Sequence, residues 1–295
     1  MSQVIKDVLQ SKGYELCGLI GEGATAQVYY IREILPKAEY ACKISDHIRW
    51  IGPEAELLKA IQHPLFPKWK AYWEVDGKGY LVMEYIAGNS LENHLRRRGI
   101  FGQEETVRIG LELADGLRYL HEKDGGFIYR DLKPDNIMIQ PDGKARLLDL
   151  GAAAISENCR AGTIGYAAPE LQLMSEQKIK SIALTPVSDI YSLGMVMHYM
   201  LTGRNPLLTK EEMKPVRKYD SRIWFGLDDI INRCISIQPQ ERIPGMRQLM
   251  TELSRYYRQS KAQIARQEIK VLLSKRKRQK IIFSKDICLS DYKNL

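Results

Sequence analysis

The sequence of 295 residues contains no run of about 18 apolar residues, and its first residues lack the apolar core of a secretory signal peptide. Its cysteines are few, odd in number and without the paired spacing of zinc ligands: Cys17, Cys42, Cys159, Cys234 and Cys288. These absences argue against a spanning helix, a disulfide framework and a structural zinc site. We therefore expect a cytoplasmic protein with free thiols and no transmembrane segment.

Acidic residues are scarce near the C-terminal end. From Arg255 to Leu295 there are 12 Lys and Arg against 3 Asp and Glu, so the net charge of +8 comes from this stretch. Its densest run, residues 275–280, is of the kind that binds acidic lipid or nucleic acid, although such runs more often form a solvated helix end or tail. We expect residues 258–295 to be a basic tail able to contact acidic surfaces, with no specific nucleic-acid binding. Residues 281–283, which follow the basic run, are too few to span a bilayer. The less common alternative to a solvated tail is therefore peripheral attachment to an anionic membrane.

The first part of the chain has the pattern of a β-rich lobe. Residues 14–45 alternate apolar and polar side chains around a glycine turn, which predicts a strand, a glycine-rich loop and two further strands. Residues 70–75 and 79–85 have the same alternation on either side of Asp76-Gly77, which predicts a hairpin.

Helical spacing replaces this alternation after Gly88. Residues 103–122 carry apolar side chains three and four positions apart, which predicts an amphipathic helix buried on one side. Shorter helical patterns follow at residues 188–202, 226–236 and 246–257. The sequence therefore predicts an α+β fold, in which a β-rich N-terminal lobe joins a helical C-terminal lobe near residues 84–88.

One string of residues is suited to phosphoryl transfer. It reads Tyr129-Arg130-Asp131-Leu132-Lys133-Pro134-Asp135-Asn136, and Asp149-Leu150-Gly151 follows thirteen residues after Asn136. One carboxylate can orient and deprotonate an attacking hydroxyl, and the lysine can neutralise phosphate charge. The amide and the second carboxylate can hold Mg²⁺. The string and Asp149 therefore contain the candidates for catalysis and for metal binding.

A glycine-rich segment, Gly21 to Val28, lies between two predicted strands. Glycines let backbone N–H groups approach phosphate oxygens, because there is no Cβ in the way. Taken alone, the segment fits a plain hairpin turn better. A dinucleotide-binding fold would need a helix next, but residues 28–31 have the pattern of a strand.

Lys43 ends an apolar strand pattern, where a lysine usually reaches solvent. Residues 53–62 predict a short helix that begins at Pro53, because proline suits the first turn of a helix. Glu54 on this helix is placed to pair with Lys43, which would aim the ammonium at a phosphate. Glu56 competes for that role, but Glu54 is preferred because it lies beside the apolar stripe.

These segments together match a family pattern. The glycine loop, Ala41-Cys42-Lys43, Glu54, the string 129–136, Asp149-Leu150-Gly151 and Ala168-Pro169-Glu170 occur in the order of the protein-kinase signature set. The chain resembles the eukaryotic-type serine/threonine protein kinases, and its compactness is most similar to their bacterial members. The resemblance covers about residues 14–257.

The resemblance implies a bilobal protein kinase fold that uses ATP and Mg²⁺, with Mn²⁺ as an alternative metal, to phosphorylate serine or threonine in proteins. It places the N-terminal lobe at about residues 14–84, the hinge at 84–88 and the C-terminal lobe at 89–257. The catalytic residues would be Asp131, Lys133 and Asn136, with Asp131 as the base and Lys133 in contact with the γ-phosphate. Asn136 and Asp149 would hold the metal. The residues implied in ATP binding are Ile20, Gly21, Gly23, Val28, Ala41, Lys43, Glu54, Met83, Glu84, Ile86, Met138 and Leu148.

The segment from Gly162 to Glu170 resembles the end of an activation loop that docks the substrate peptide. Thr163 would then contact Asp131 and Lys133. The resemblance also implies three supporting residues, because Glu170 would pair with Arg242 and Asp189 would anchor the catalytic-loop backbone. A further hypothesis is that Ser156 is autophosphorylated and pairs with Arg130. A loop ordered without phosphate is an equal alternative.

The sequence departs from the family pattern at Ala26, Tyr129 and Leu150, which stand where glycine, histidine and phenylalanine are usual. None of these changes removes a group that would touch phosphate or metal. The alternative function is a nucleotide-binding pseudokinase scaffold. A small-molecule kinase is disfavoured, because such enzymes lack the docking segment Ala168-Pro169-Glu170.

Overall fold

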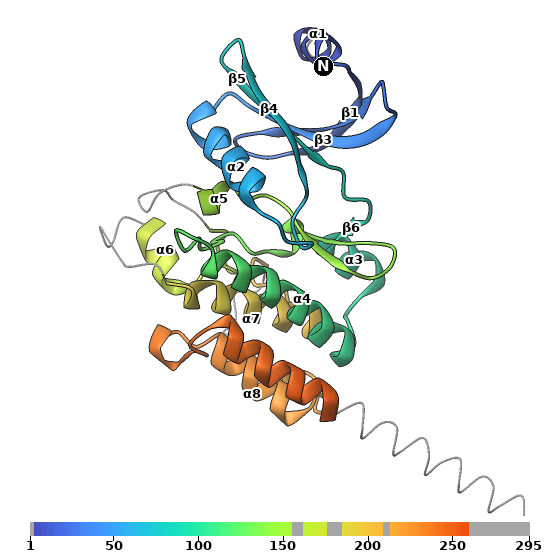
Figure 1. Cartoon of the computed structure of the whole chain (residues 1–295). Helices are drawn as coiled ribbons and strands as arrows, with labels where there is room; N and C mark the ends of the chain where they lie inside the picture. Colours follow the sequence, from blue (N-terminus) through green and yellow to red (C-terminus); the bar gives the residue numbers. More distant parts are fainter. Residues whose placement is uncertain (1–2, 155–161, 176–184, 209–212, 260–295) are drawn as a thin grey trace, which may run out of the picture.

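The computed structural model describes residues 3–154, 162–175, 185–208 and 213–259. Five antiparallel strands form the N-terminal lobe, in the order β1-β2-β3-β5-β4 (Figure 1). They are β1 (Tyr14–Glu22), β2 (Gln27–Glu33), β3 (Ala38–Ser45), β4 (Trp69–Val75) and β5 (Lys78–Glu84). The predicted strands, the glycine-rich loop between β1 and β2, and the hairpin of β4 and β5 are all present.

Two helices cover opposite faces of this sheet, α1 (Gln3–Ser11) and α2 (Ile48–Ala60). Successive side chains of β5 point to opposite faces. Leu81 and Met83 accordingly belong to the core that includes α2, whereas Tyr80 and Val82 pack with the apolar side chains of α1. The sheet is therefore buried on both sides, and the N-terminal lobe extends upstream of residue 14.

The predicted start of the second helix at Pro53 is wrong, because α2 begins five residues earlier and contains Pro53 in its interior. Pro53 cannot donate a backbone hydrogen bond, so it removes one bond from the helix. The earlier start adds Ile51 to the buried stripe that includes Leu57 and Leu58. Burial of this face outweighs the single lost bond.

The C-terminal lobe is helical, as predicted (Figure 1). Its long helices are α4 (Gln103–Glu122) and α7 (Val187–Thr202), which pack on each other. The shorter helices are α3 (Leu91–Arg98), α5 (Gly151–Ala154), α6 (Pro169–Ser175) and α8 (Phe225–Cys234), and residues 246–259 are also helical. Single 3₁₀ turns are η1 (Pro134–Asn136), η2 (Val216–Lys218) and η3 (Pro239–Glu241). In the part of the chain that the structure describes, no helix is long and apolar enough to cross a membrane.

A small sheet in the C-terminal lobe lies next to the segments that contain Asn136 and Asp149. Its strands are β6 (Asn89–Ser90), β7 (Ile137–Ile139) and β8 (Ala145–Leu147), in that order. The catalytic string ends where β7 begins, and Asp149 follows β8 by two residues. The antiparallel pairing of β7 with β8 therefore brings the two predicted metal candidates to the same end of this sheet.

Candidate active site

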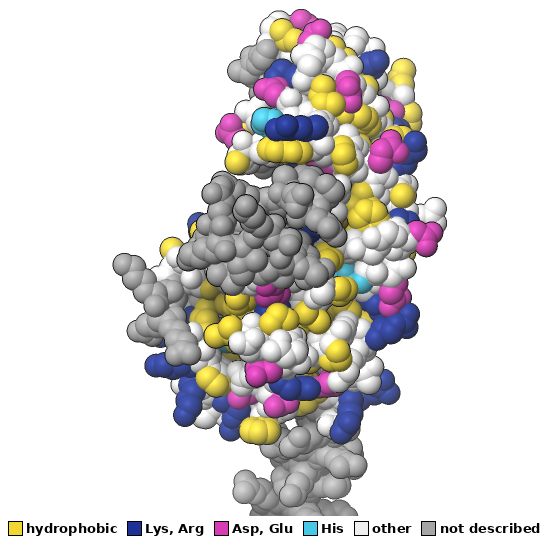
Figure 2. Space-filling view, turned by 90° about the vertical axis from the view of Figure 1, so that its left-hand side faces the viewer, with side chains coloured by type: hydrophobic (Ala, Val, Ile, Leu, Met, Phe, Trp, Pro, Cys, Tyr) yellow, Lys and Arg dark blue, Asp and Glu magenta, His cyan; other side chains and the backbone are white. Residues whose placement is uncertain are grey.

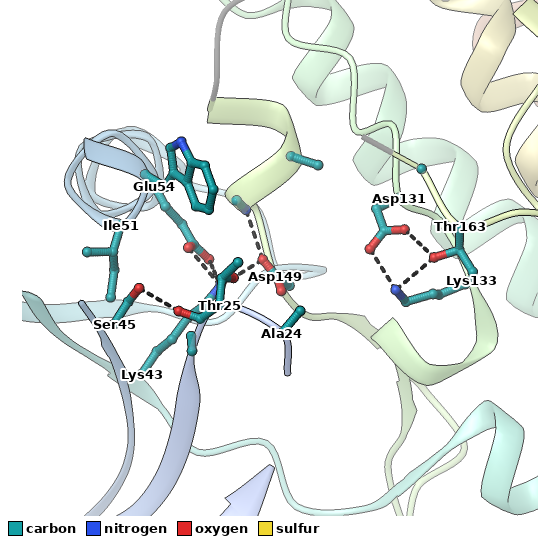
Figure 3. A pocket seen from close by; sticks show the side chains of 15 residues that line it. Ala24, Thr25, Lys43, Ser45, Ile51, Glu54, Asp131, Lys133, Asp149 and Thr163 are labelled. Atoms are coloured by element: carbon teal, nitrogen blue, oxygen red, sulfur yellow. Dashed lines mark hydrogen bonds and ion pairs between the residues drawn. The ribbon is translucent and has the colours of Figure 1, made fainter. Parts of the chain in front are cut away.

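A cavity of about 380 Å³ lies between the lobes (Figure 3). The N-terminal lobe lines it from the glycine-rich loop, the end of β3 and the first half of α2. The C-terminal lobe lines it from the catalytic string, the start of α5 and the segment around Thr163. The side chains that bear charge or a hydroxyl are Thr25, Lys43, Ser45, Glu54, Asp131, Lys133, Asp149 and Thr163.

Lys43 binds a carboxylate from each lobe. Its Nζ lies 2.9 and 2.7 Å from the two oxygens of Glu54, and 2.8 Å from Oδ1 of Asp149. The structure therefore brings Lys43 and Glu54 together as predicted. The competing residue, Glu56, is exposed on the other side of α2. The buried ammonium of Lys43 thus joins β3 to α2 and to Asp149, in the segment after β8.

Burial and neighbouring charges shift the pKa values of this group in different directions. Burial alone would lower the pKa of Lys43, but Glu54 and Asp149 outweigh it and raise that pKa, so the ammonium remains charged. Burial would raise the pKa of Asp149, but Lys43 and the Gly151 N–H lower it to about 2. Burial raises the pKa of the Glu54 carboxyl, and the nearby ammonium opposes this. The site therefore holds a fixed positive charge beside an ionised carboxylate.

Asp131 and Lys133 form a hydrogen-bonded cluster with a hydroxyl. The Nζ of Lys133 lies 2.8 Å from Asp131 Oδ2, and it donates to the Thr163 hydroxyl at 2.9 Å. That hydroxyl in turn donates to Asp131 Oδ1 at 2.7 Å. The predicted contacts of Thr163 with both residues are therefore present. The arrangement binds an aliphatic hydroxyl between a carboxylate and an ammonium (Figure 3).

The backbone of the catalytic string is anchored by Asp189 on α7. This fully buried carboxylate accepts hydrogen bonds from the backbone N–H groups of Tyr129 at 2.8 Å and Arg130 at 2.9 Å. Arg130 has a φ of 68°, a conformation that non-glycine residues adopt only when their surroundings hold them there. These two bonds are the backbone contacts predicted for Asp189, and they hold Arg130 in its unusual conformation.

His121 completes this anchor, although the sequence did not single it out. His121 lies at the end of α4, and its Nε2 is 2.8 Å from Asp189 Oδ2, the oxygen that also accepts from the Tyr129 N–H. Tyr129 adds another tie, because its hydroxyl donates to the carbonyl oxygen of Leu148. A tyrosine at this position therefore links the catalytic string to the chain just before Asp149.

The donor set near Asp131 fits a magnesium ion. The side-chain amide of Asn136 donates to the backbone oxygen of Asp131 at 2.9 Å and to its Oδ2 at 3.1 Å. Within the described part of the chain, this orientation lets the Asn136 side-chain oxygen face a ligand. Asp149 uses Oδ1 for Lys43 and for the Gly151 N–H, which leaves Oδ2 for a metal. Carboxylate and amide oxygens, completed by phosphate and water, are the ligands that Mg²⁺ prefers.

Apart from Lys43 and Glu54, the residues implied in ATP binding do not line this cavity and lie on or beside the neighbouring strands. Ala41 of β3 and Met83 of β5 pair across the sheet, and Val28 packs against the same core. From the other lobe, Met138 is on β7 and Leu148 follows β8. Ile20 is half exposed on β1, and Gly21 pairs with Val28 at the base of the loop that holds Gly23.

The hinge makes contacts that the sequence did not predict. The Glu84 carboxylate pairs with Arg146 at 2.7 Å and accepts a hydrogen bond from the Lys68 N–H at 3.0 Å. The Glu84 N–H donates to the Lys68 carbonyl at 2.8 Å, so it is not available to a nucleobase. Ile86 follows in the hinge and is buried.

A buried ion pair forms at Glu170, the last residue of the segment 162–170 that resembles the end of an activation loop. The guanidinium of Arg242 makes two bonds to Glu170, at 2.7 and 2.8 Å, and Ser188 donates to the same carboxylate at 2.8 Å. The predicted pair is therefore present. Ser156, the predicted phosphorylation site, lies outside the described residues.

Comparison with known proteins gives a consistent result. Residues 14–253 match the family model described as protein kinase domain. The chain is 31% identical to sperm motility kinase 2B of Mus musculus over 245 residues, which are 78% of this chain and 49% of that protein. It is 30% identical to the serine/threonine-protein kinase AtPK2/AtPK19 of Arabidopsis thaliana over 217 residues, which are 69% of this chain and 44% of the plant protein. The chain thus spans about half the length of these relatives or less.

Proposed function

Because the chain belongs to the protein kinase domain family, we propose that it transfers the γ-phosphate of ATP to serine or threonine hydroxyls of protein substrates. The name of the plant relative supports the acceptor class, since it is a serine/threonine-protein kinase at 30% identity. The similarity to bacterial members stays a prediction, because the relatives reported above come from mouse and plant.

The observation that carries this proposal is the position of the Thr163 hydroxyl. It donates to Asp131 at 2.7 Å and accepts from Lys133 at 2.9 Å. A serine or threonine of a substrate presents the same group, with the same ability to donate one hydrogen bond and accept another. A phenol is held on a longer, rigid side chain, so its oxygen would need a different approach.

The residues divide the reaction between the lobes. Asp131 orients the acceptor hydroxyl and takes its proton as the hydroxyl oxygen bonds to the γ-phosphorus. The bond from that phosphorus to the β–γ bridging oxygen breaks and ADP leaves, while Lys133 compensates negative charge on the transferred group. Lys43, held by Glu54, supplies the positive charge for the α- and β-phosphates. Asn136 and Asp149 would hold Mg²⁺, which when bound neutralises phosphate charge and keeps the reacting oxygens in line.

The test is phosphate transfer from labelled ATP to the chain itself or to a generic basic protein. We expect Asp131→Asn to lower kcat by about 10²- to 10⁴-fold, the usual contribution of a positioned general base. Asp142→Asn is the matched control, because it makes the same change in an exposed turn. Transfer that is absent from the wild type despite ATP binding would favour the pseudokinase scaffold, and labelled phosphotyrosine would contradict the acceptor class.

Autophosphorylation of Ser156 belongs to the same proposal. Mass spectrometry after incubation with Mg-ATP would detect the phosphate on the peptide that contains it. A fully active enzyme with an unmodified peptide would overturn this part, and the loop would then be ordered without phosphate.

The basic tail extends the proposal to acidic surfaces. Arg255 and Arg258, from the last described helical residues, line a groove with Arg118 and Arg247. On the face shown in Figure 2, most Lys and Arg side chains lie on the helical lobe. Vesicles that contain anionic lipid should sediment the full chain but not the chain without residues 274–295. Equal sedimentation of both would contradict this role.

A cytoplasmic location is proposed from cysteine usage. Among the described residues, Cys17, Cys42 and Cys234 are free thiols. Such cysteines suit a reducing compartment. Fractionation of the producing cell would test this, and recovery outside the cytoplasmic and membrane-associated fractions would contradict it.

A further inference from the structure

Ser45, the last residue of β3, makes two hydrogen bonds that no part of the proposed chemistry uses. Its hydroxyl donates to the backbone carbonyl of Thr25 at 2.6 Å and accepts from the backbone N–H of His47 at 3.0 Å. The residue is only 5% exposed, and its hydroxyl lies at the edge of the cavity (Figure 3). A buried hydroxyl with both a donor and an acceptor bond is fixed in orientation.

The first bond reaches the tip of the glycine-rich loop. Residues 23–26 connect β1 to β2 and close on themselves through a bond from the Gly23 N–H to the Ala26 carbonyl. Thr25 is exposed, as is most of the tip. Among the residues that the structure describes, the Ser45 bond is the one hydrogen bond that ties residues 23–26 to a segment outside this hairpin.

The second bond reaches the start of α2. His47 is the residue before the helix, and its carbonyl accepts from the N–H groups of Trp50 and Ile51 in the first turn. The same helix carries Glu54 two turns later, and Lys43 lies two positions before Ser45 on β3. One hydroxyl therefore connects the loop tip, the strand of the phosphate-binding lysine and the helix of its partner.

We infer that Ser45 is a positioning residue, which holds the tip of the glycine-rich loop over the phosphates in register with α2. The inference rests on the proposed function, because it assigns this loop to the phosphates of ATP. Ser45 itself touches neither nucleotide nor acceptor in this role. A loop that is already in place loses less conformational entropy when ATP binds, so the bond strengthens nucleotide binding.

The expected effect is selective for the nucleotide. Ser45→Ala removes both bonds, and loss of the one to the loop should raise both Kd and KM for ATP by about 3- to 10-fold. The kcat and the KM for the protein substrate should each change less than twofold, because Asp131 and Lys133 belong to the C-terminal lobe. Ser45→Thr keeps the hydroxyl and should restore most of the affinity.

A merely structural serine should behave differently, and Ser188→Ala provides that comparison. Ser188 is fully buried and donates a 2.8 Å bond to Glu170, outside the cavity. Its replacement should lower the Tm without a selective rise in KM for ATP. Equal effects of Ser45→Ala and Ser188→Ala on Tm, kcat and KM would overturn the inference.

Hydrogen–deuterium exchange of the nucleotide-free chain tests the loop without reference to catalysis. Peptides that cover residues 21–28 should exchange faster in Ser45→Ala than in wild type, while peptides of α4 should not change. Unchanged exchange in the loop would overturn the inference, even if Ser45→Thr fails to fold. A wild type that does not bind ATP would instead contradict the proposed function and leave the exchange result to decide the role of Ser45.

Discussion

The two halves of the site are held in very different ways. In the C-terminal lobe, the catalytic string is bonded to Asp189, which is fully buried, and to His121 through the same carboxylate. In the N-terminal lobe, the tip of the glycine-rich loop is exposed and is bonded to its surroundings through Ser45. The acceptor half therefore rests on a buried polar network. Among the described residues, the tip of the glycine-rich loop in the nucleotide half has a single hydrogen bond to a segment outside its hairpin.

This difference suits the two tasks. The groups that receive a hydroxyl must keep their geometry to within a fraction of an ångström, which a buried and fully bonded network provides. Under the proposed function, the loop that covers the phosphates would open to admit ATP and release the product, which suits a less stable part of the fold. Lys43 spans both halves, because it bonds Glu54 of α2 and Asp149 of the C-terminal lobe.

The largest effect is expected from breaking the buried pair of Arg242 and Glu170. The Arg242 side chain is fully buried and also donates to the Ser236 carbonyl at 2.8 Å. Arg242→Ala would leave the Glu170 carboxylate buried without its cation. We expect the free energy of unfolding to fall by about 3–5 kcal/mol, measured by urea denaturation.

Arg247→Ala is the control for this prediction. Arg247 also pairs with a glutamate, Glu122, but its side chain is 74% exposed. Exposed pairs contribute about 0–1 kcal/mol, so this variant should be close to wild type. Similar losses for the two arginines would contradict the view that burial makes the C-terminal network strong.

A smaller effect, on activity, is expected in the nucleotide half. Glu54→Gln removes the charge that holds Lys43 in place, and bonds to charged groups contribute about 1.5–3 kcal/mol. We expect kcat/KM for ATP to fall by about 10- to 100-fold, measured by steady-state kinetics. Glu56→Gln, on the exposed face of α2, should leave kcat/KM unchanged. An equal fall in both variants would mean that α2, and not the ion pair, is disturbed.

The sequence predicts those features of the two lobes that depend on the periodicity of apolar residues or on a family motif. Residues 103–122 were predicted as one helix and form α4 over the same range, because their apolar side chains recur at helical spacing. The contacts of Lys43 with Glu54, and of Thr163 with Asp131, follow from the family pattern.

Other features depend on contacts that have no local signal. The helix α1 has only two buried residues, Ile5 and Leu9, so its stability comes from the sheet it covers. The bonds of Ser45 to Thr25 and of His121 to Asp189 join residues 20 and 68 positions apart. A weak hint for Ser45 exists, since it lies on the same face of β3 as Lys43, two positions away.

The smallest expected effect is a change of stability with pH that arises from Glu170. Burial would raise the pKa of this carboxyl, but the bonds from Arg242 and Ser188 lower it below its ordinary value of 4.5. A carboxylate with a lowered pKa in the folded state stabilises the fold fully above its unfolded pKa, and this contribution is lost as the pH falls through the folded value. Urea denaturation of wild type and Glu170→Gln should therefore give the largest difference near pH 7. The difference should shrink as the pH falls below about 4.5, where the unfolded chain takes up a proton at Glu170, and should be smallest below the lowered folded pKa, where the native carboxyl is also protonated. Glu56→Gln is the matched control, because it makes the same change on an exposed side chain. If the difference in free energy of unfolding stays constant from pH 7 to pH 3, Glu170 contributes through shape and neutral hydrogen bonds. Its charge would then not be what makes the buried network of the C-terminal lobe stronger than the bonds of the N-terminal lobe.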